Sequence, residues 1–364
     1  MQAGLLTTYQ HPASNRGIVA WLAGAALMAF YLLLYLPGSS WTPAFPDVIT
    51  PISSALHLPS KWFLYGLLYS VGMGVGGYFM LQKHGNSRYH RLRTISLLAV
   101  QIGLAFCLPL VLNVTGNPEY YLSYVWPLSY DKLYPDTLKN LPLYMAVYFV
   151  GMSLVVFPFL AFWKGKRFYC SWVCGCGGLA ETFGDPWRHL SDKSDRAWRI
   201  EQVSIYGVLV LILVTTGLLI ADAAGATASP AVHAAAGGLK GFYSFFIGAL
   251  FSGVVGVGLY PLMGSRVWCR FGCPMAAILG IFQKFGRFRV TVKKDMCISC
   301  GNCSTYCEMG IDVRAYAMAN QDIKRASCVG CGMCAHVCPR GVLKLETKSD
   351  AGPQGDIQVW TLDL

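Results

Sequence analysis

The chain alternates long apolar runs with short polar segments as far as Met263. Six of these runs contain no charged residue and reach the roughly 20 residues that a helix needs to cross a bilayer. They are Gly17 to Leu36, Trp62 to Leu81, Ile95 to Val114, Leu143 to Phe162, Val203 to Ala221, and Phe242 to Met263. The pattern predicts a bundle of six membrane-spanning helices.

Lys and Arg are distributed unevenly between the connecting segments. The second and fourth connections and the segment after the sixth run are rich in both residues, whereas the intervening connections hold one or two each. Cytoplasmic loops carry such an excess of positive charge. We therefore expect a multi-pass protein of the bacterial cytoplasmic (inner) membrane with both termini in the cytoplasm. This bias explains most of the formal charge of +11, so we expect no nucleic-acid partner.

The composition changes near Gly286, where turn residues, cysteines and short apolar stretches replace the long runs. We therefore expect an α-helical membrane domain over residues 1–286. A small α+β domain should follow over residues 287–346, and a C-terminal tail over residues 347–364. The chain as a whole is 54% hydrophobic and 13% charged, which is too apolar for an ordinary soluble fold.

Two cysteine quartets in the small domain share the spacing C-x2-C-x2-C-x3-C. They are "CISCGNCSTYC", with Cys297, Cys300, Cys303 and Cys307, and "CVGCGMCAHVC", with Cys328, Cys331, Cys334 and Cys338. In this spacing three cysteines hold one iron-sulfur cubane and the fourth ligates the other. We expect one [4Fe-4S] cluster on Cys297, Cys300, Cys303 and Cys338, and a second on Cys328, Cys331, Cys334 and Cys307. Zinc and disulfides fit two such tight quartets less well.

A second cysteine pattern occurs twice, each time after an even-numbered apolar run. "GKRFYCSWVC" (165–174) and "GSRVWCRFGC" (264–273) both read G-x-R-x-aromatic-C-x3-C, which indicates an internal repeat. The two copies would bring four thiols together at the cytoplasmic ends of the helices, namely Cys170, Cys174, Cys269 and Cys273. Three interpretations remain open: a third iron-sulfur or metal centre, a redox-active or structural thiol pair, or small buried residues that allow tight packing. Cys176 has no counterpart and is either a spare ligand or inert.

The segment from Cys297 to Pro339 resembles a bacterial two-cluster ferredoxin, with Glu308 where that family usually has proline. Together with the apolar runs and the two C-x3-C elements, it makes the chain similar to the NapH/NosR family of membrane ferredoxins, which includes the FixG/CcoG-like assembly proteins. "CRFGCP" keeps the family's proline as Pro274, whereas Gly175 follows Cys174. The resemblance implies electron transfer between the quinone pool and redox partner subunits.

The resemblance also limits the cofactors. No connection is long enough for the extracytoplasmic flavin domain of NosR, so we expect no covalent flavin. All seven histidines fall outside the predicted spans, and membrane haem needs axial histidines within the bundle, so we expect no haem. His84 and His90, in the second connection, are expected to be solvated, although either could protonate a quinone.

These features predict a membrane-bound iron-sulfur protein that relays electrons between quinone or quinol and a redox partner complex, as the electron-transfer subunit of a quinol-linked oxidoreductase. One alternative is a membrane metal (copper) reductase or respiratory-complex maturation factor, because thiolates suit Cu(I). Another is a non-catalytic redox-sensing or scaffolding subunit. No residue is nominated as catalytic, and the direction of electron flow is left open.

Overall fold

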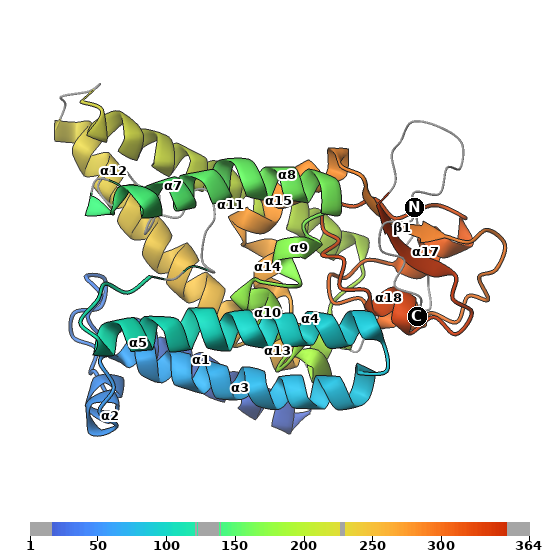
Figure 1. Ribbon diagram of the computed structural model, residues 1–364, viewed down its shortest axis with the longest axis horizontal. Helices are drawn as coiled ribbons and strands as arrows, with labels where there is room; N and C mark the ends of the chain where they lie inside the picture. Colours follow the sequence, from blue (N-terminus) through green and yellow to red (C-terminus); the bar gives the residue numbers. More distant parts are fainter. Residues whose placement is uncertain (1–16, 121, 123–137, 139, 226–229, 348–364) are drawn as a thin grey trace.

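The computed structural model describes residues 17–120, 122, 138, 140–225 and 230–347 (Figure 1). Within these ranges six helices are long and apolar enough to cross a membrane: Ile18–Tyr35, Lys61–His84, Arg88–Val114, Leu143–Lys164, Asp195–Ala223 and Pro230–Val255. The small domain lies at one end of this bundle. The helices are consistent with a membrane protein. Apart from Thr347, the predicted C-terminal tail lies outside the described residues.

The long helices divide into the following elements. The first two are α1 (Ile18–Tyr35) and α3 (Lys61–His84), with the short α2 (Ile49–Ala55) between them. The third comprises α4 (Arg88–Leu98), the π-helical η2 (Ala99–Cys107) and α5 (Leu108–Val114). The fourth comprises α7 (Leu143–Gly151), the π-helical η3 (Met152–Val156) and α8 (Phe157–Lys164). The fifth is α11 (Asp195–Ala223), and the sixth comprises α12 (Pro230–Phe242) and the π-helical η5 (Tyr243–Val255).

Two of the π-helical segments end where a proline enters the helix. Pro109 is the second residue of α5 and Pro158 the second residue of α8. Proline has no N–H to donate, and its ring clashes with the carbonyl one turn earlier. A locally wider turn relieves both problems, so both helices stay continuous across the proline.

The predicted bounds of the sixth span are wrong. The helix begins at Pro230 rather than Phe242 and ends at Val255 rather than Met263. The Ala- and Gly-rich stretch after Pro230 is only weakly apolar, yet proline suits the first turn of a helix. Lys240, expected in a connection, therefore lies on α12. The third and fifth helices also begin earlier than predicted, because their charged first turns continue the same helix.

Short elements fill the end of the bundle that faces the small domain (Figure 1). Between the fourth and fifth long helices lie α9 (Arg167–Cys170), α10 (Gly175–Glu181) and the 3₁₀ helix η4 (Asp185–Leu190). After the sixth come α13 (Tyr260–Met263), α14 (Val267–Phe271) and α15 (Pro274–Phe285). Helix α10 packs against α3, α4 and α14, and α15 packs against α8 and α11. Both membrane cysteine motifs therefore lie among the long helices, at the end of the bundle next to the small domain.

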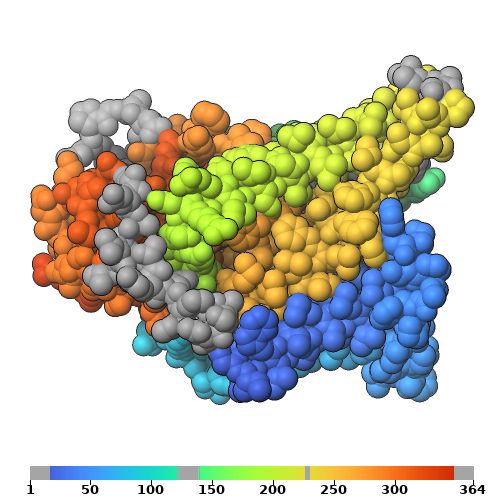
Figure 2. Space-filling model, turned by 180° about the vertical axis from the view of Figure 1, so that it is seen from behind, coloured from blue at the N-terminus to red at the C-terminus, as the bar shows by residue number. Residues whose placement is uncertain are grey.

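The small domain begins directly after α15. It contains β1 (Phe288–Val292), α16 (Asn302–Thr305), α17 (Val313–Met318), α18 (Met333–His336) and β2 (Leu343–Thr347). The two strands pair antiparallel, with Phe288 opposite Thr347. The Arg287 N–H donates to the Phe162 carbonyl at 2.9 Å, which ties the domain to α8. Figure 2 shows the other face, with α11 extending from the small domain toward α12.

Candidate iron-sulfur and thiol sites

The eight cysteines of the small domain line two separate cavities. The first, which we call the distal site, is lined by Cys297, Cys300, Cys303 and Cys338. The second, which we call the proximal site, is lined by Cys307, Cys328, Cys331 and Cys334. The structure therefore groups these side chains in the crossed arrangement that the spacing predicts. Cluster binding by each group stays a prediction.

The two crossing cysteines share one local geometry. The Ile311 N–H donates to the Cys307 sulfur at 3.4 Å, and the Val342 N–H donates to the Cys338 sulfur at the same distance. In each case the donor lies four residues after the cysteine. Amides that point at a sulfur stabilise negative charge there, and such hydrogen bonds help to set the reduction potential of a bound cluster.

The donor chemistry of both sites fits a cubane cluster. Each site offers four sulfur atoms around a shared space, which is the ligand set of [4Fe-4S]. Burial raises the pKa of the Cys303 thiol to about 12 and that of Cys328 to about 11. Without a cation both thiols would stay protonated, whereas a coordinated metal removes the proton outright. When bound, the clusters would supply one-electron carriers.

The proximal site is fixed against the membrane domain. Four consecutive backbone carbonyls of its motif accept hydrogen bonds from membrane-domain side chains. Gln283 Nε2 donates to Cys328 O, Ser171 Oγ to Val329 O and Tyr89 Oη to Gly330 O, each at 2.8 Å, and Arg93 donates to Cys331 O. These donors come from α15, the turn after α9, and α4. At the distal site, by contrast, Cys300 is exposed.

Gly330 sits where this docking leaves no room for a side chain. Its φ is +61°, and a Cβ there would lie 2.8 Å from the Cβ of Arg167. We expect Gly330→Ala to cost about 1–2 kcal/mol from the left-handed backbone alone, plus the clash. The variant should therefore lose iron from the proximal site, measured as iron per chain and by the spectrum of that cluster.

Ser299 provides the matched control for Gly330→Ala. It holds the equivalent position in the distal motif, with a φ of +56°. Ser299→Ala should keep its iron, because that position already carries a Cβ. Equal iron loss in both variants would contradict the docking explanation.

Five buried charged side chains lie beside the proximal site, and we call them the charge cluster: Arg93, Glu181, Arg188, Arg266 and Glu308. None is more than 1% exposed. Glu181 pairs with all three arginines at 2.7–2.9 Å. Glu308 pairs with Arg188 at 3.1 Å and with Arg266 at 3.0 Å. The cluster joins α4, α10, η4 and the start of α14 to the small domain.

The two carboxyls of the charge cluster shift in opposite directions. Burial by itself raises the pKa of Glu181, but the three guanidiniums outweigh it and hold that pKa well below its usual range. Burial raises the pKa of Glu308, against the pull of Arg266. Glu308 follows Cys307 directly, where the resemblance leads one to expect proline. Its side chain links the proximal motif to Arg188 and Arg266.

The carboxylates of the charge cluster also approach a proximal cysteine. Single ligand atoms of Glu181, Glu308 and Cys331 lie within 4.8 Å of one another, close enough to hold a metal ion. However, Arg188 and Arg266 already neutralise both carboxylates, and their positive charge would repel a further cation. We interpret this group as ion pairing rather than as a metal site.

The membrane-domain cysteines form a third group. The five thiols belong to one buried region at the bundle end: Cys170, Cys174, Cys176, Cys269 and Cys273. Cys176 interacts electrostatically with Cys174, Cys269 and Cys273, so the structure brings the residue without a counterpart next to three of the other four thiols. A hydrogen bond from the Cys176 thiol lowers the pKa of Cys174 to about 6. A thiolate is the form that binds metals.

Arg266 connects this thiol group with the charge cluster. One of its guanidinium nitrogens lies 3.7 Å from the Cys269 sulfur and 3.3 Å from the Cys170 carbonyl. The other pairs with Glu181 and Glu308. A single side chain therefore contacts both the membrane thiols and the carboxylate that follows Cys307.

The two C-x3-C elements adopt the same local turn. Each follows a glycine with positive φ, Gly165 at +77° and Gly264 at +95°. The Cys174 N–H donates to Tyr169 O at 2.8 Å, and the Cys273 N–H donates to Trp268 O at 3.0 Å. The second cysteine then precedes a helix in both elements. The repeated spacing thus corresponds to equivalent backbone geometry.

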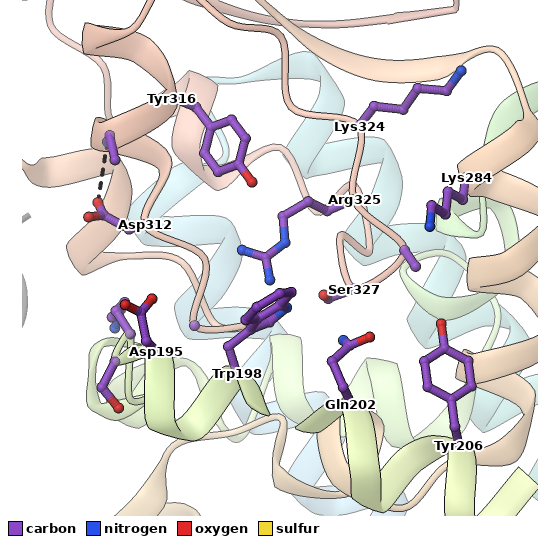
Figure 3. A pocket seen from close by; sticks show the side chains of 15 residues that line it. Asp195, Trp198, Gln202, Tyr206, Lys284, Asp312, Tyr316, Lys324, Arg325 and Ser327 are labelled. Atoms are coloured by element: carbon purple, nitrogen blue, oxygen red, sulfur yellow. Dashed lines mark hydrogen bonds between the residues drawn. The ribbon is translucent and has the colours of Figure 1, made fainter. Parts of the chain in front are cut away.

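Two larger cavities flank the small domain. One, of about 330 Å³, lies between the start of α11 and the segment before Cys328. In Figure 3 Arg325 reaches over the Trp198 ring, with Gln202 and Tyr206 beside it on α11. The Arg325 guanidinium lies 5.3 Å from the ring centroid. The other cavity, of about 660 Å³, lies where α4, α9 and the small domain meet.

The expectation of solvated histidines is wrong for His84 and His90. Both are buried, at 7% and 2% exposure, and they pack with His336 of α18. His336 Nε2 lies 3.0 Å from His84 Nδ1. The reason is that the connection between α3 and α4 is only a few residues long. The histidines therefore lie at the ends of the two helices, where the small domain covers them.

Comparison with known protein families identifies ferredoxin-type domains in both halves of the chain. A family model described as a 4Fe-4S dicluster domain matches residues 289–339, which contain all eight small-domain ligands predicted from the spacing. A model described as a 4Fe-4S binding domain matches residues 147–199 and again residues 245–293, which contain the two C-x3-C elements. The chain therefore carries 4Fe-4S ferredoxin-type domains.

Distant relatives bear related descriptions. The chain is 26% identical over 153 residues to "Putative electron transport protein YccM" of Escherichia coli, covering 41% of this chain and 43% of that protein. It is 25% identical over 167 residues to "Methylamine utilization ferredoxin-type protein MauN" of Methylobacillus flagellatus, covering 43% and 53%. The matched regions thus span about half the length of these relatives. No solved structure matches the chain.

Proposed function

We propose that the protein is a membrane-bound iron-sulfur electron-transfer protein that relays electrons between the quinone pool and a redox partner complex. The 4Fe-4S domains and the descriptions of the relatives as electron transport and ferredoxin-type proteins support iron-sulfur electron transfer. The protein would position its clusters and tune their potentials through burial, hydrogen bonds and nearby charge.

One observation carries this proposal: direct side-chain contacts link the membrane thiols to the proximal site. Arg266 touches Cys269 on one side and Glu308, next to Cys307, on the other. Arg188 joins Glu308 and lies 4.0 Å from the Cys331 sulfur. The distal site then lies beyond, with Cys300 exposed. The sequence of membrane thiols, proximal site and distal site is a path for electrons from the bilayer to a partner.

The proposal includes a third iron-sulfur centre on the membrane thiols, held by the two copies of an internal repeat. The 4Fe-4S binding model that matches both copies supports it. We place the protein in the inner membrane with both termini and the small domain in the cytoplasm, since the basic residues collect on that side. The same features make membership of the NapH/NosR-like membrane ferredoxins the most economical assignment.

The third centre can be tested by counting iron. Three cubanes require about twelve irons per chain, against about eight for the two ferredoxin clusters alone. We expect anaerobically purified protein to approach the higher number. Cys170→Ser should lower it to the value for two clusters and remove one component from the low-temperature EPR spectrum.

Cys107 is the control for this count. It lies in η2, exposed on the surface of the bundle, and Cys107→Ser should leave iron and spectrum unchanged. A wild-type protein with about eight irons would refute the third cluster, as two cubanes account for that number. Clusters that no quinol reduces under anaerobic mixing would refute the quinone link.

A second candidate function is favoured by the fifth thiol. A cubane takes four cysteines, whereas Cys176 adds a further sulfur beside Cys174. A buried group of soft donors with one easily ionised thiol suits Cu(I), as a metal reductase or maturation factor would need. Tight Cu(I) binding by the wild type, lost in Cys269→Ser, Cys273→Ser, would support this function over the relay.

A further inference from the structure

The cavity of about 660 Å³ lies at the junction of bundle and small domain. Its walls come from α4, the segment from Lys164 to Val173, and the stretch of the small domain from Gly332 to Glu346. Its lining combines aromatic and aliphatic side chains with the basic side chains of Lys164, Arg167, Lys293 and Lys344. Cavities of this size that combine apolar surface with polar groups are typical of small-molecule sites. Neither the thiol groups nor the charge cluster accounts for this space.

The cavity shares a wall with the proximal site. Gly332 lines both of them. A Cβ on Gly332 would lie 2.7 Å from the Tyr89 ring, so the ring lies directly against the backbone of the cysteine loop. Tyr89 also donates its hydroxyl proton to Gly330 O. A molecule in the cavity would be separated from the proximal cysteines by one layer of backbone.

The wall contains flat aromatic surfaces. Tyr89 and Trp172 pack edge to face with centroids 5.6 Å apart, and Trp172 Nε1 donates to Tyr89 Oη at 3.3 Å. Phe168 lines the same space. This hydrogen bond fixes both rings in orientation. Such surfaces suit stacking with a planar ring.

His90 belongs to this wall and has a ring nitrogen without a partner. His90 is 2% exposed, and its Nδ1 is buried without a hydrogen bond among the described residues. His90 lines the cavity together with His336, and their ring centroids are 4.8 Å apart. An unpaired buried polar atom costs free energy. A ligand oxygen in the cavity would recover this cost once the His90 ring turns its Nδ1 toward the cavity.

The cavity also lies beside surface that lipid would cover. Ser96 and Lys164 line it at the ends of two predicted membrane spans. Next to them the side chains of Ile95 and Phe162 face outward, at 49% and 42% exposure. A ligand with a ring in the cavity could therefore extend an apolar tail into the bilayer between these side chains.

We infer that this cavity binds the ring of a quinone or quinol, with His90 hydrogen-bonded to one ring oxygen and the Tyr89–Trp172 pair against the ring face. The inference rests on the proposed quinone-linked function and adds to it the place of binding. The shared wall at Gly332 puts the ring next to the proximal site rather than next to the exposed distal site.

The test is binding of 2-heptyl-4-hydroxyquinoline N-oxide, a fluorescent quinol analogue, to the full-length protein in detergent. Its fluorescence reports binding without any turnover of the clusters. We expect His90→Leu to weaken binding by about tenfold, because it removes one buried hydrogen bond. His90→Gln keeps a polar group at this position and should restore part of the affinity.

Gln202→Leu is the matched control, since Gln202 lines the cavity on the far side of the small domain. It should bind the analogue like the wild type. Iron per chain should be unchanged in all three variants. Wild-type protein that does not bind the analogue, or His90→Leu that binds it as tightly as wild type, would overturn the inference.

The same variants separate this inference from the proposed function. If quinol reduces the clusters equally fast in wild type and His90→Leu, the relay stands and the site is elsewhere. If His90→Leu weakens analogue binding but no quinol reduces the wild-type clusters, the site stands and the quinone-linked relay fails.

Discussion

Alanine in place of Cys338 is expected to remove about four irons per chain, one cubane's content, and to abolish the signal of the distal cluster only. Cys338 belongs to the second motif in sequence but lines the cavity of Cys297, Cys300 and Cys303. Cys307→Ala should remove the proximal cluster instead, since Cys307 lines that cavity. Iron analysis with EPR of the reduced protein measures both losses.

Double variants make the crossed assignment sharper. Cys297→Ala with Cys338→Ala should lose no more iron than either single variant, because both changes affect one cluster. Cys297→Ala with Cys307→Ala should lose about eight irons, two cubanes. Residues that act as one unit are non-additive in this way, whereas independent sites add. The opposite pattern would mean that each motif holds its own cluster.

Glu181→Gln is expected to destabilise the junction between the two domains. Glu181 pairs with three buried arginines, and removing one partner of a buried ion pair typically costs about 3–5 kcal/mol. We expect a lower unfolding midpoint in detergent. Amide hydrogen exchange should also become faster over residues 329–332, because Arg93, Arg188 and Arg266 hold that loop directly or through Glu308.

Asp222→Asn is the control for Glu181→Gln. Asp222 pairs with His233 at 2.9 Å, but that pair is largely exposed, and exposed pairs contribute little to stability. The control should unfold like the wild type. If both variants have the same midpoint and the same exchange rates, the charge cluster does not hold the domains together.

The fold is largely predictable from the sequence because long uncharged runs have few alternatives to membrane helices. Four of the six predicted spans fall within helices of the structure, and the first exceeds its helix by one residue at each end. The predicted bounds of the sixth span are wrong because they follow the most apolar stretch. The helix instead begins at Pro230 and includes the small, weakly apolar residues after it. The fifth begins at Asp195 rather than Val203 because a helix continues past the apolar part into its charged first turn.

The cysteine groupings follow from spacing, but the charge cluster does not. Arg188 and Arg266 belong to segments whose basic residues are explained by the positive-inside bias, and nothing in the sequence marks these two as buried. The recurrence of arginine at 167 and 266 was one available signal. It is ambiguous, because Arg266 enters the charge cluster whereas Arg167 lies 4.7 Å above the Phe288 ring. For Glu308, the only signal in the sequence is that it stands where two-cluster ferredoxins usually have proline, and this does not indicate a buried ion pair.

The docking of the proximal loop has a consequence for biosynthesis. Val329, Gly330 and Gly332 are buried, and the carbonyls from Cys328 to Cys331 are bonded to the membrane domain. A carrier that delivers a preformed cluster has no access to this loop once the two domains are joined. A cluster bound at the proximal site would therefore have to be loaded while the newly made small domain is still undocked, whereas the distal site, with Cys300 exposed, would remain open to repair in the finished protein.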